Sequence, residues 1–189
     1  MRRRDVLAGV ASLGIVGGGG AVALHGLPTR GDRAGTDSEN DDGSESANVE
    51  PLAIETVEAP GSEAGEVRIP ASDRPTFIDF FGTWCAPCSK QMPALVEAND
   101  RVGDEVLFIS VTSESISDEK LVDWWEEHDG NWLLGLDPTA ELTTRYDLSA
   151  YPFAVAIDAS GRVRYSDSGI KTADELVSGI EQAIDASDG

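Results

Sequence analysis

The sequence is poor in basic residues and in cysteine. Its 189 residues hold 14 Lys and Arg against 35 Asp and Glu, a formal net charge of -21. Such a surface repels phosphate backbones, so we exclude nucleic acid as a partner. Two cysteines are too few for the disulfide framework of a small secreted domain. A hydrophobic content of 40% is ample for a core, so the chain as a whole is not disordered.

The acid excess goes beyond what solubility requires, since a net charge of roughly 2–8 is usually enough for a small domain. It suits a salt-rich habitat, because the Debye length falls to roughly 3 Å at about 1 M salt and surface carboxylates then repel one another little. We therefore predict a halophilic protein that unfolds at low salt, with ordinary solubility as the alternative explanation.

The first 27 residues are typical of an export signal. Three cations at residues 2–4 precede an uncharged stretch that runs from Val6 to Thr29. Residues 3–7 (RRDVL) resemble a twin-arginine signal, and residues 21–23 (AVA) offer a cleavage site. We predict a protein that acts outside the cytoplasm. It is secreted if the signal is cleaved, and tethered to the cell membrane if the signal is kept as an anchor.

Residues 28–50 have the composition of an acidic, disordered linker. They hold seven Asp and Glu residues against two Arg, with almost no large apolar side chain. Such a segment cannot bury enough surface to order itself, and its like charges extend it. The third part of the chain, residues 51–189, is then one domain.

Within that domain, strand-like and helix-like patterns alternate. Strands are expected at residues 52–57, 66–69, 76–81, 106–111, 132–136, 153–157 and 162–165. Helices are expected at residues 85–99 and 118–128, from Asp137 and Pro138 onward, and from a capping box at residues 172–175. This order predicts an α/β fold with a mixed β-sheet flanked by helices on both faces.

The chemically informative motif is Trp84-Cys85-Ala86-Pro87-Cys88, where a buried strand passes into a helix. Two intervening residues let the sulfurs reach bonding distance within one helical turn. Cys85 then lies at the helix N-terminus, which favours a thiolate with a pKa of roughly 3.5–7.5, against about 8.5 for free cysteine. We assign Cys85 as the nucleophile that attacks a substrate disulfide and Cys88 as the resolving thiol.

Other roles for the cysteine pair stay open at this point. A stabilising disulfide across so short a loop removes little entropy. Structural zinc wants four Cys or His ligands, and the sequence adds only His25 and His128. Coincidental free thiols are a third explanation. A copper metallochaperone that uses the same two cysteines is the alternative function. We expect no cofactor beyond the redox-active disulfide of Cys85 and Cys88.

The run FFGTWCAPC at residues 80–88, followed by Lys90, Met92, Pro93 and Leu95, resembles the thioredoxin-like superfamily. The resemblance covers about residues 51–189 and is strongest to the extracytoplasmic TlpA/ResA/DsbE type. It implies a thioredoxin fold and dithiol exchange with protein disulfides, often as a reductant in cytochrome c maturation. It also implies a membrane electron donor of the CcdA/DsbD kind. We expect a monomer.

The resemblance extends to two further positions. Pro152, before the strand at residues 153–157, matches the family's cis-proline, which lies against the CxxC and lets main-chain groups pair with an incoming peptide. Tyr151 would then face the sulfurs and contact substrate. Asp79 occupies the place of a buried Asp in thioredoxins. Burial would raise its pKa and let it exchange protons with the Cys88 thiol, unless it is a solvated edge residue.

The residues around the cysteines bear on substrate and on redox poise. Trp84 and Pro87 are expected to contact substrate, with core packing as the alternative for Trp84. The dipeptide Ala86-Pro87 lacks the His that stabilises the thiolate in the strong oxidants of the family. Reduction potentials in the family run from about -270 mV for thioredoxin to about -120 mV for DsbA. We therefore expect the potential of this protein to lie in the reducing half of that range.

Overall fold

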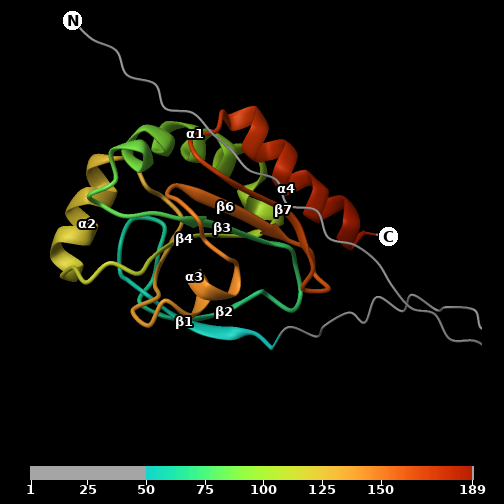
Figure 1. The fold of residues 1–189 in the computed structure, drawn as a ribbon, viewed down its shortest axis with the longest axis horizontal. Helices are drawn as coiled ribbons and strands as arrows, with labels where there is room; N and C mark the ends of the chain where they lie inside the picture. Colours follow the sequence, from blue (N-terminus) through green and yellow to red (C-terminus); the bar gives the residue numbers. More distant parts are fainter. Residues whose placement is uncertain (1–49, 189) are drawn as a thin grey trace, which may run out of the picture. The chain divides into compact units, whose positions relative to one another are not determined.

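A mixed β-sheet in the order β2-β1-β5-β4-β3-β6-β7 organises the chain (Figure 1). The computed structural model describes residues 50–188. The signal predicted at residues 1–27 and all but the last residue of the linker predicted at 28–50 lie outside this range. None of the helices in the described residues combines the length and the apolar content needed to cross a membrane.

The elements follow the predicted order closely. The strands are β1 (Leu52–Thr56), β2 (Gly65–Ile69), β3 (Thr76–Phe80), β4 (Leu107–Thr112), β5 (Leu133–Leu136), β6 (Phe153–Ile157) and β7 (Val163–Ser168). The helices are α1 (Ala86–Val102), α2 (Asp118–Glu127), α3 (Glu141–Arg145) and α4 (Ala173–Ser187), with a 3-10 turn at Gly103–Glu105.

The centre of the sheet combines parallel and antiparallel pairs. β3, β4 and β5 run parallel, while β6 pairs antiparallel with β3 on the other side. Every residue of β3, β4 and β6 is buried, which is why these strands read as nearly unbroken apolar runs. The alternation of side chains then decides which residues face which layer of helices.

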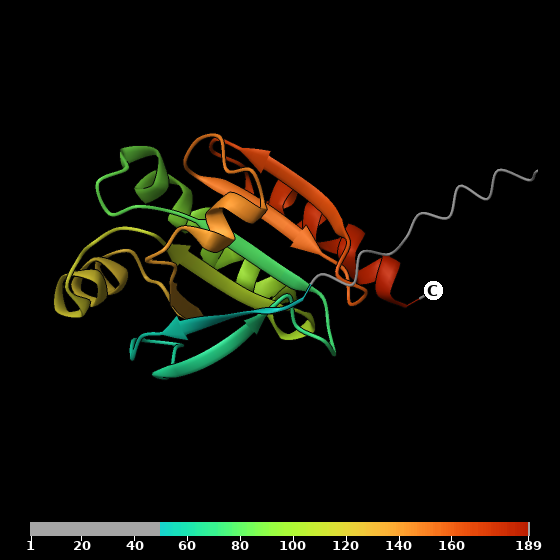
Figure 2. The same cartoon turned by 60° about the horizontal axis from the view of Figure 1, so that its bottom comes forward.

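Two apolar cores cover the two faces of the sheet. One face packs against α1, α2 and α4 through residues such as Phe77, Leu95 and Trp125. The opposite face packs against α3 through residues such as Ile109 and Leu142. Figure 2 shows α3 in front of the sheet, with α1 and α4 behind it. The predicted mixed sheet with helices on both faces is confirmed.

The helix expected to begin at Pro138 begins instead at Glu141. A turn comes first, in which the Ala140 N–H donates to the Asp137 carbonyl oxygen over 2.9 Å and Ala140 takes a φ of 55°. The Asp137 carboxylate still caps the helix, since it accepts the N–H groups of residues 141–143 at 2.9–3.3 Å. The N-cap residue is therefore Ala140, and the predicted N-cap position at Asp137 is wrong, although the Asp137 side chain supplies the acceptors for the first turn.

Candidate active site

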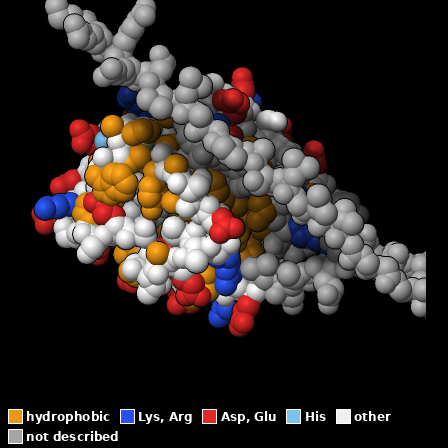
Figure 3. Space-filling model, in the orientation of Figure 1, with side chains coloured by type: hydrophobic (Ala, Val, Ile, Leu, Met, Phe, Trp, Pro, Cys, Tyr) orange, Lys and Arg blue, Asp and Glu red, His pale blue; other side chains and the backbone are white. Residues whose placement is uncertain are grey.

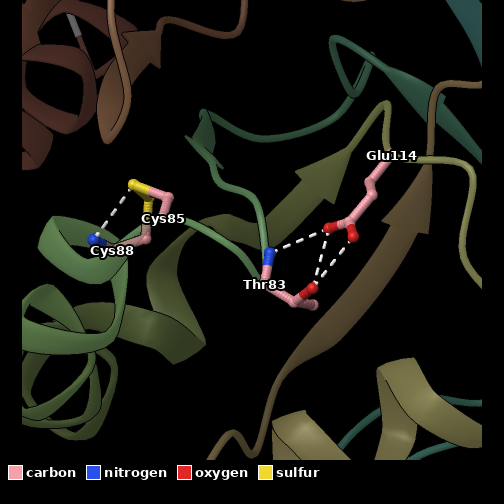
Figure 4. Close-up of a disulfide and its surroundings, with 4 residues drawn as sticks. All are labelled: Thr83, Cys85, Cys88 and Glu114. Atoms are coloured by element: carbon pink, nitrogen blue, oxygen red, sulfur yellow. Dashed lines mark hydrogen bonds between the residues drawn. A yellow bond between two sulfur atoms is a disulfide. The ribbon is translucent and has the colours of Figure 1, made fainter.

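Cys85 and Cys88 form a disulfide at the start of α1, where the chain leaves β3 (Figure 4). Their Cα atoms are 5.2 Å apart, and the two residues are 5% and 2% exposed. Cys85 is the N-cap residue of α1, and its Sγ accepts the Cys88 N–H over 3.3 Å. This N–H and the helix dipole would stabilise negative charge on the Cys85 sulfur once the disulfide opens.

A tight turn delivers Cys85 to this position. The Cys85 N–H donates to the Gly82 carbonyl oxygen over 3.0 Å, so Thr83 and Trp84 occupy the middle of the turn. The indole of Trp84 lies over Gly82, where a Cβ atom would come within 2.9 Å of the ring. Trp84 is nevertheless 68% exposed, so its alternative role as a core residue is wrong.

Exposed apolar side chains flank the two cysteines. Ala86 and Pro87 are exposed next to Trp84, and Trp124 is partly exposed on α2. Figure 3 shows hydrophobic side chains gathered in the region that lies between α1 and α2 in Figure 1, with acidic side chains at its outer margin. On a chain with so large a net charge, an apolar patch beside the reactive sulfurs is a surface suited to contact another molecule.

The Tyr151–Pro152 segment completes this end of the sheet. The peptide bond before Pro152 is cis, as predicted. Pro152 enters β6, whose first residue, Phe153, pairs with Phe80 at the end of β3. The cis-proline thus lies beside the strand that leads to the cysteines. The Tyr151 ring meets the Trp84 indole edge-on, with centroids 5.6 Å apart.

Asp79 is buried in the centre of the sheet, only 2% exposed. It lies on β3, between β4 and β6, so the alternative of a solvated edge position is wrong. Its Oδ2 accepts the hydroxyl of Ser110 over 3.1 Å, and the Trp132 indole N–H donates to that hydroxyl over 2.9 Å. Burial raises the pKa of Asp79 to about 7, although the Ser110 hydrogen bond opposes the rise. Asp79 can therefore gain or lose a proton near neutral pH.

The buried side chain of Gln91 makes contacts that the sequence did not predict. From α1, Gln91 donates to the Lys171 carbonyl oxygen over 3.1 Å and accepts the Lys171 N–H over 2.6 Å. In the same loop, the Gly169 N–H donates to the Pro152 carbonyl oxygen over 2.8 Å. The loop after β7 is therefore fixed both to the helix of the CxxC motif and to the cis-proline.

Glu114 was also missed. It follows β4 and hydrogen-bonds to Thr83, in the turn before Cys85 (Figure 4). A usable signal was present, because polar side chains just after the carboxyl ends of parallel strands often gather at a site.

The described residues contain no group of three or more His, Cys, Asp or Glu side chains placed to hold a metal ion. His128, the histidine within this range, stacks on Trp124 with ring centroids 4.2 Å apart. Its Nδ1 lies 2.8 Å from the Trp124 carbonyl oxygen, so this nitrogen is engaged within the protein.

Comparison with known proteins agrees with this geometry. The Redoxin family matches residues 60–184. The thiol-disulfide oxidoreductase ResA of Bacillus thuringiensis is 26% identical over 100 residues, which are 53% of this chain and 58% of the relative. The chain spans about three fifths of the length of the ResA proteins that it matches.

Solved structures share the fold. StoA from Bacillus subtilis superposes with a TM-score of 0.59 at 22% identity, covering 68% of this chain and 95% of StoA. A secreted Mycobacterium tuberculosis disulfide oxidoreductase homologous to DsbE superposes with a TM-score of 0.58 at 16% identity, covering 69% and 94%. The predicted thioredoxin fold is confirmed.

Proposed function

The chain belongs to the redoxin family of thioredoxin-like proteins, and from this premise we propose that it is a thiol–disulfide oxidoreductase of the TlpA/ResA/DsbE type. The observation that carries the proposal is the Cys85–Cys88 disulfide at the N-terminus of α1, beside exposed Trp84 and the cis-proline Pro152. In this proposal Cys85 is the activated sulfur and Cys88 its resolving partner, and the apolar side chains beside them contact the substrate.

The proposed reaction begins with the reduced dithiol. The Cys85 thiolate attacks one sulfur of a substrate disulfide, which forms a mixed disulfide and releases the other substrate sulfur as a thiolate. The Cys88 thiol then loses its proton, for which the Asp79 carboxylate is the proposed acceptor through water. The Cys88 thiolate attacks the Cys85 sulfur and frees the second substrate sulfur as a thiolate, and both substrate thiolates take protons from water. The substrate gains two electrons, and the enzyme is left with the Cys85–Cys88 disulfide.

The direction and place of action belong to the same proposal. Because Ala86 and Pro87 supply no charge to stabilise the thiolate, we favour the reductant direction, with cytochrome c maturation as one setting. A membrane dithiol donor of the CcdA/DsbD kind would restore the dithiol. The twin-arginine-like residues 3–7 support action outside the cytoplasm, as does likeness to a secreted oxidoreductase.

A trapping experiment with the full-length chain tests this function. Reduced Cys88→Ser should form adducts with disulfide-containing proteins that a dithiol reagent releases, since Cys85 can attack but nothing resolves the mixed disulfide. The same variant should lose multiple-turnover reduction of insulin. The matched control, Cys85→Ser, should trap nothing. The proposal fails if Cys88→Ser turns over like the wild type, or if Cys85→Ser traps as much.

A further inference from the structure

Two residues after β4 touch both halves of the proposed site. Ser113 and Glu114 lie between β4 and α2, and the Thr112 hydroxyl accepts the Glu114 N–H over 3.2 Å. Thr112 is buried at 1% exposure, so it fixes this segment to the end of a central strand. We refer to Ser113 and Glu114 together as the brace.

The Glu114 end of the brace holds the turn that carries the nucleophile. Its Oε2 accepts the Thr83 N–H over 2.9 Å, and the Thr83 hydroxyl lies 2.9 and 3.0 Å from the two carboxylate oxygens (Figure 4). In the turn closed between Gly82 and Cys85, the Thr83 N–H points outward, away from the turn's own hydrogen bond. Glu114 satisfies this donor two residues before Cys85.

The Ser113 end of the brace holds the residue before the cis-proline. The Ser113 Oγ lies 3.2 Å from the Tyr151 hydroxyl, within hydrogen-bond distance. The Tyr151 ring in turn meets Trp84, which directly follows Thr83. The contacts therefore close a ring that runs through the CxxC turn, the aromatic pair, the cis-proline segment and the brace.

We propose, resting on the oxidoreductase function proposed above, that Ser113 and Glu114 are positioning residues that set the spacing between the Cys85 turn and the Tyr151–Pro152 segment. A protein substrate has to present its sulfur to Cys85 while its main chain lies along Pro152. Displacement of either part by about 1 Å can cost up to about a hundredfold in rate. A small soluble disulfide needs only the sulfur, so it depends far less on the spacing.

Two substrates measured on one set of variants test the brace. The rate constants are those of the reduced full-length protein with insulin and with Ellman's reagent. Glu114→Ala should lower the insulin rate about tenfold and the Ellman rate less than about threefold. Glu114→Gln keeps an acceptor for Thr83 and should stay within about threefold of the wild type on both substrates. Glu126→Ala, which removes an exposed carboxylate from α2, is the matched control and should change neither rate.

Milder variants cover the case in which Glu114→Ala does not fold. Thr83→Val removes the hydroxyl but keeps the shape, and Ser113→Ala releases Tyr151. Each should slow insulin several-fold more than Ellman's reagent. Combining Thr83→Val with Glu114→Ala should cost no more than Glu114→Ala alone, because Glu114→Ala already removes the partner of the Thr83 hydroxyl.

Three results would overturn the brace. They are unchanged insulin rates in all the variants, equal losses on the two substrates, and matching effects of Glu114→Gln and Glu114→Ala, which would assign the effect to charge. None of these three results would contradict the proposed oxidoreductase function, because that function is tested by the variants of Cys85 and Cys88.

Discussion

The buried carboxyl of Asp79 should make the stability of the fold depend on pH. Burial raises its pKa from 3.8 to about 7, so between these values the folded chain binds a proton that the unfolded chain has lost. The stabilisation is therefore complete below the lower value and disappears as the pH rises through the upper one. A difference of about three pKa units corresponds to about 4 kcal/mol. In Asp79→Asn the side chain is neutral at every pH and can still accept the Ser110 hydroxyl, so this loss should vanish.

Urea unfolding of the oxidised wild type and of Asp79→Asn, at constant salt from about pH 4 to about pH 8, measures the effect. The difference in free energy of unfolding should shift in favour of the Asn variant by about 4 kcal/mol across this window. A cost in stability from burying the amide of the Asp79→Asn variant would be the same at every pH, so it does not affect how this difference changes with pH. Ser110→Ala removes a hydrogen bond that lowers the Asp79 pKa. In this variant the fall in the free energy of unfolding should therefore extend to higher pH than in the wild type. Parallel curves for the wild type and Asp79→Asn would refute the reasoning.

Two further predictions concern the exposed side chain of Trp84 and the buried carboxylate of Asp158. Trp84→Ala should change the free energy of unfolding by less than about 0.5 kcal/mol, because the side chain is exposed, yet slow insulin reduction several-fold. Trp125→Ala, at a fully buried indole, should instead cost about 3–5 kcal/mol in urea unfolding, and similar costs for the two would contradict the placement of Trp84. Asp158 is buried, which opposes its charge, but hydrogen bonds from Ser160, Arg162 and Arg164 outweigh this and lower its pKa. Its stabilisation is present above the ordinary value of 3.8 and lost as the pH falls through the lowered one. Asp158→Asn should thus cost about 2 kcal/mol at neutral pH and little in strong acid, and a cost that persists in acid would count against the ionic contribution.

Most of the architecture was predictable because its signals are local. Unbroken apolar runs located the central strands, and the capping box at residues 172–175 located the start of α4, where Thr172 and Glu175 hydrogen-bond reciprocally. The start of α3 was not predictable in the same way. Ala140 takes a left-handed conformation that its residue type does not announce. The pairing of β1 with β5 likewise joins segments about 80 residues apart, which periodicity does not reveal.

The residues of the site likewise divide into those with a local signal in the sequence and those that depend on distant contacts. The CxxC motif and the cis-proline could be located because the chemistry lies in adjacent residues or in a family pattern. Asp79 could be noticed as a lone carboxyl in an apolar strand. Glu114 and Gln91 act through contacts 31 and 80 residues away in the sequence, so neither residue is informative until the fold brings its partner near.

The strand order leaves β2 and β7 at the two margins of the sheet, each with one side unpaired by another strand of the described fold. Both carry exposed charges, Glu66 and Arg68 on one and Arg164 and Asp167 on the other. A strand from a second molecule could dock there only by desolvating these groups, a cost that dissolved salt does not remove. Even where salt screens the large net charge, strand-by-strand polymerisation of folded molecules should therefore be disfavoured.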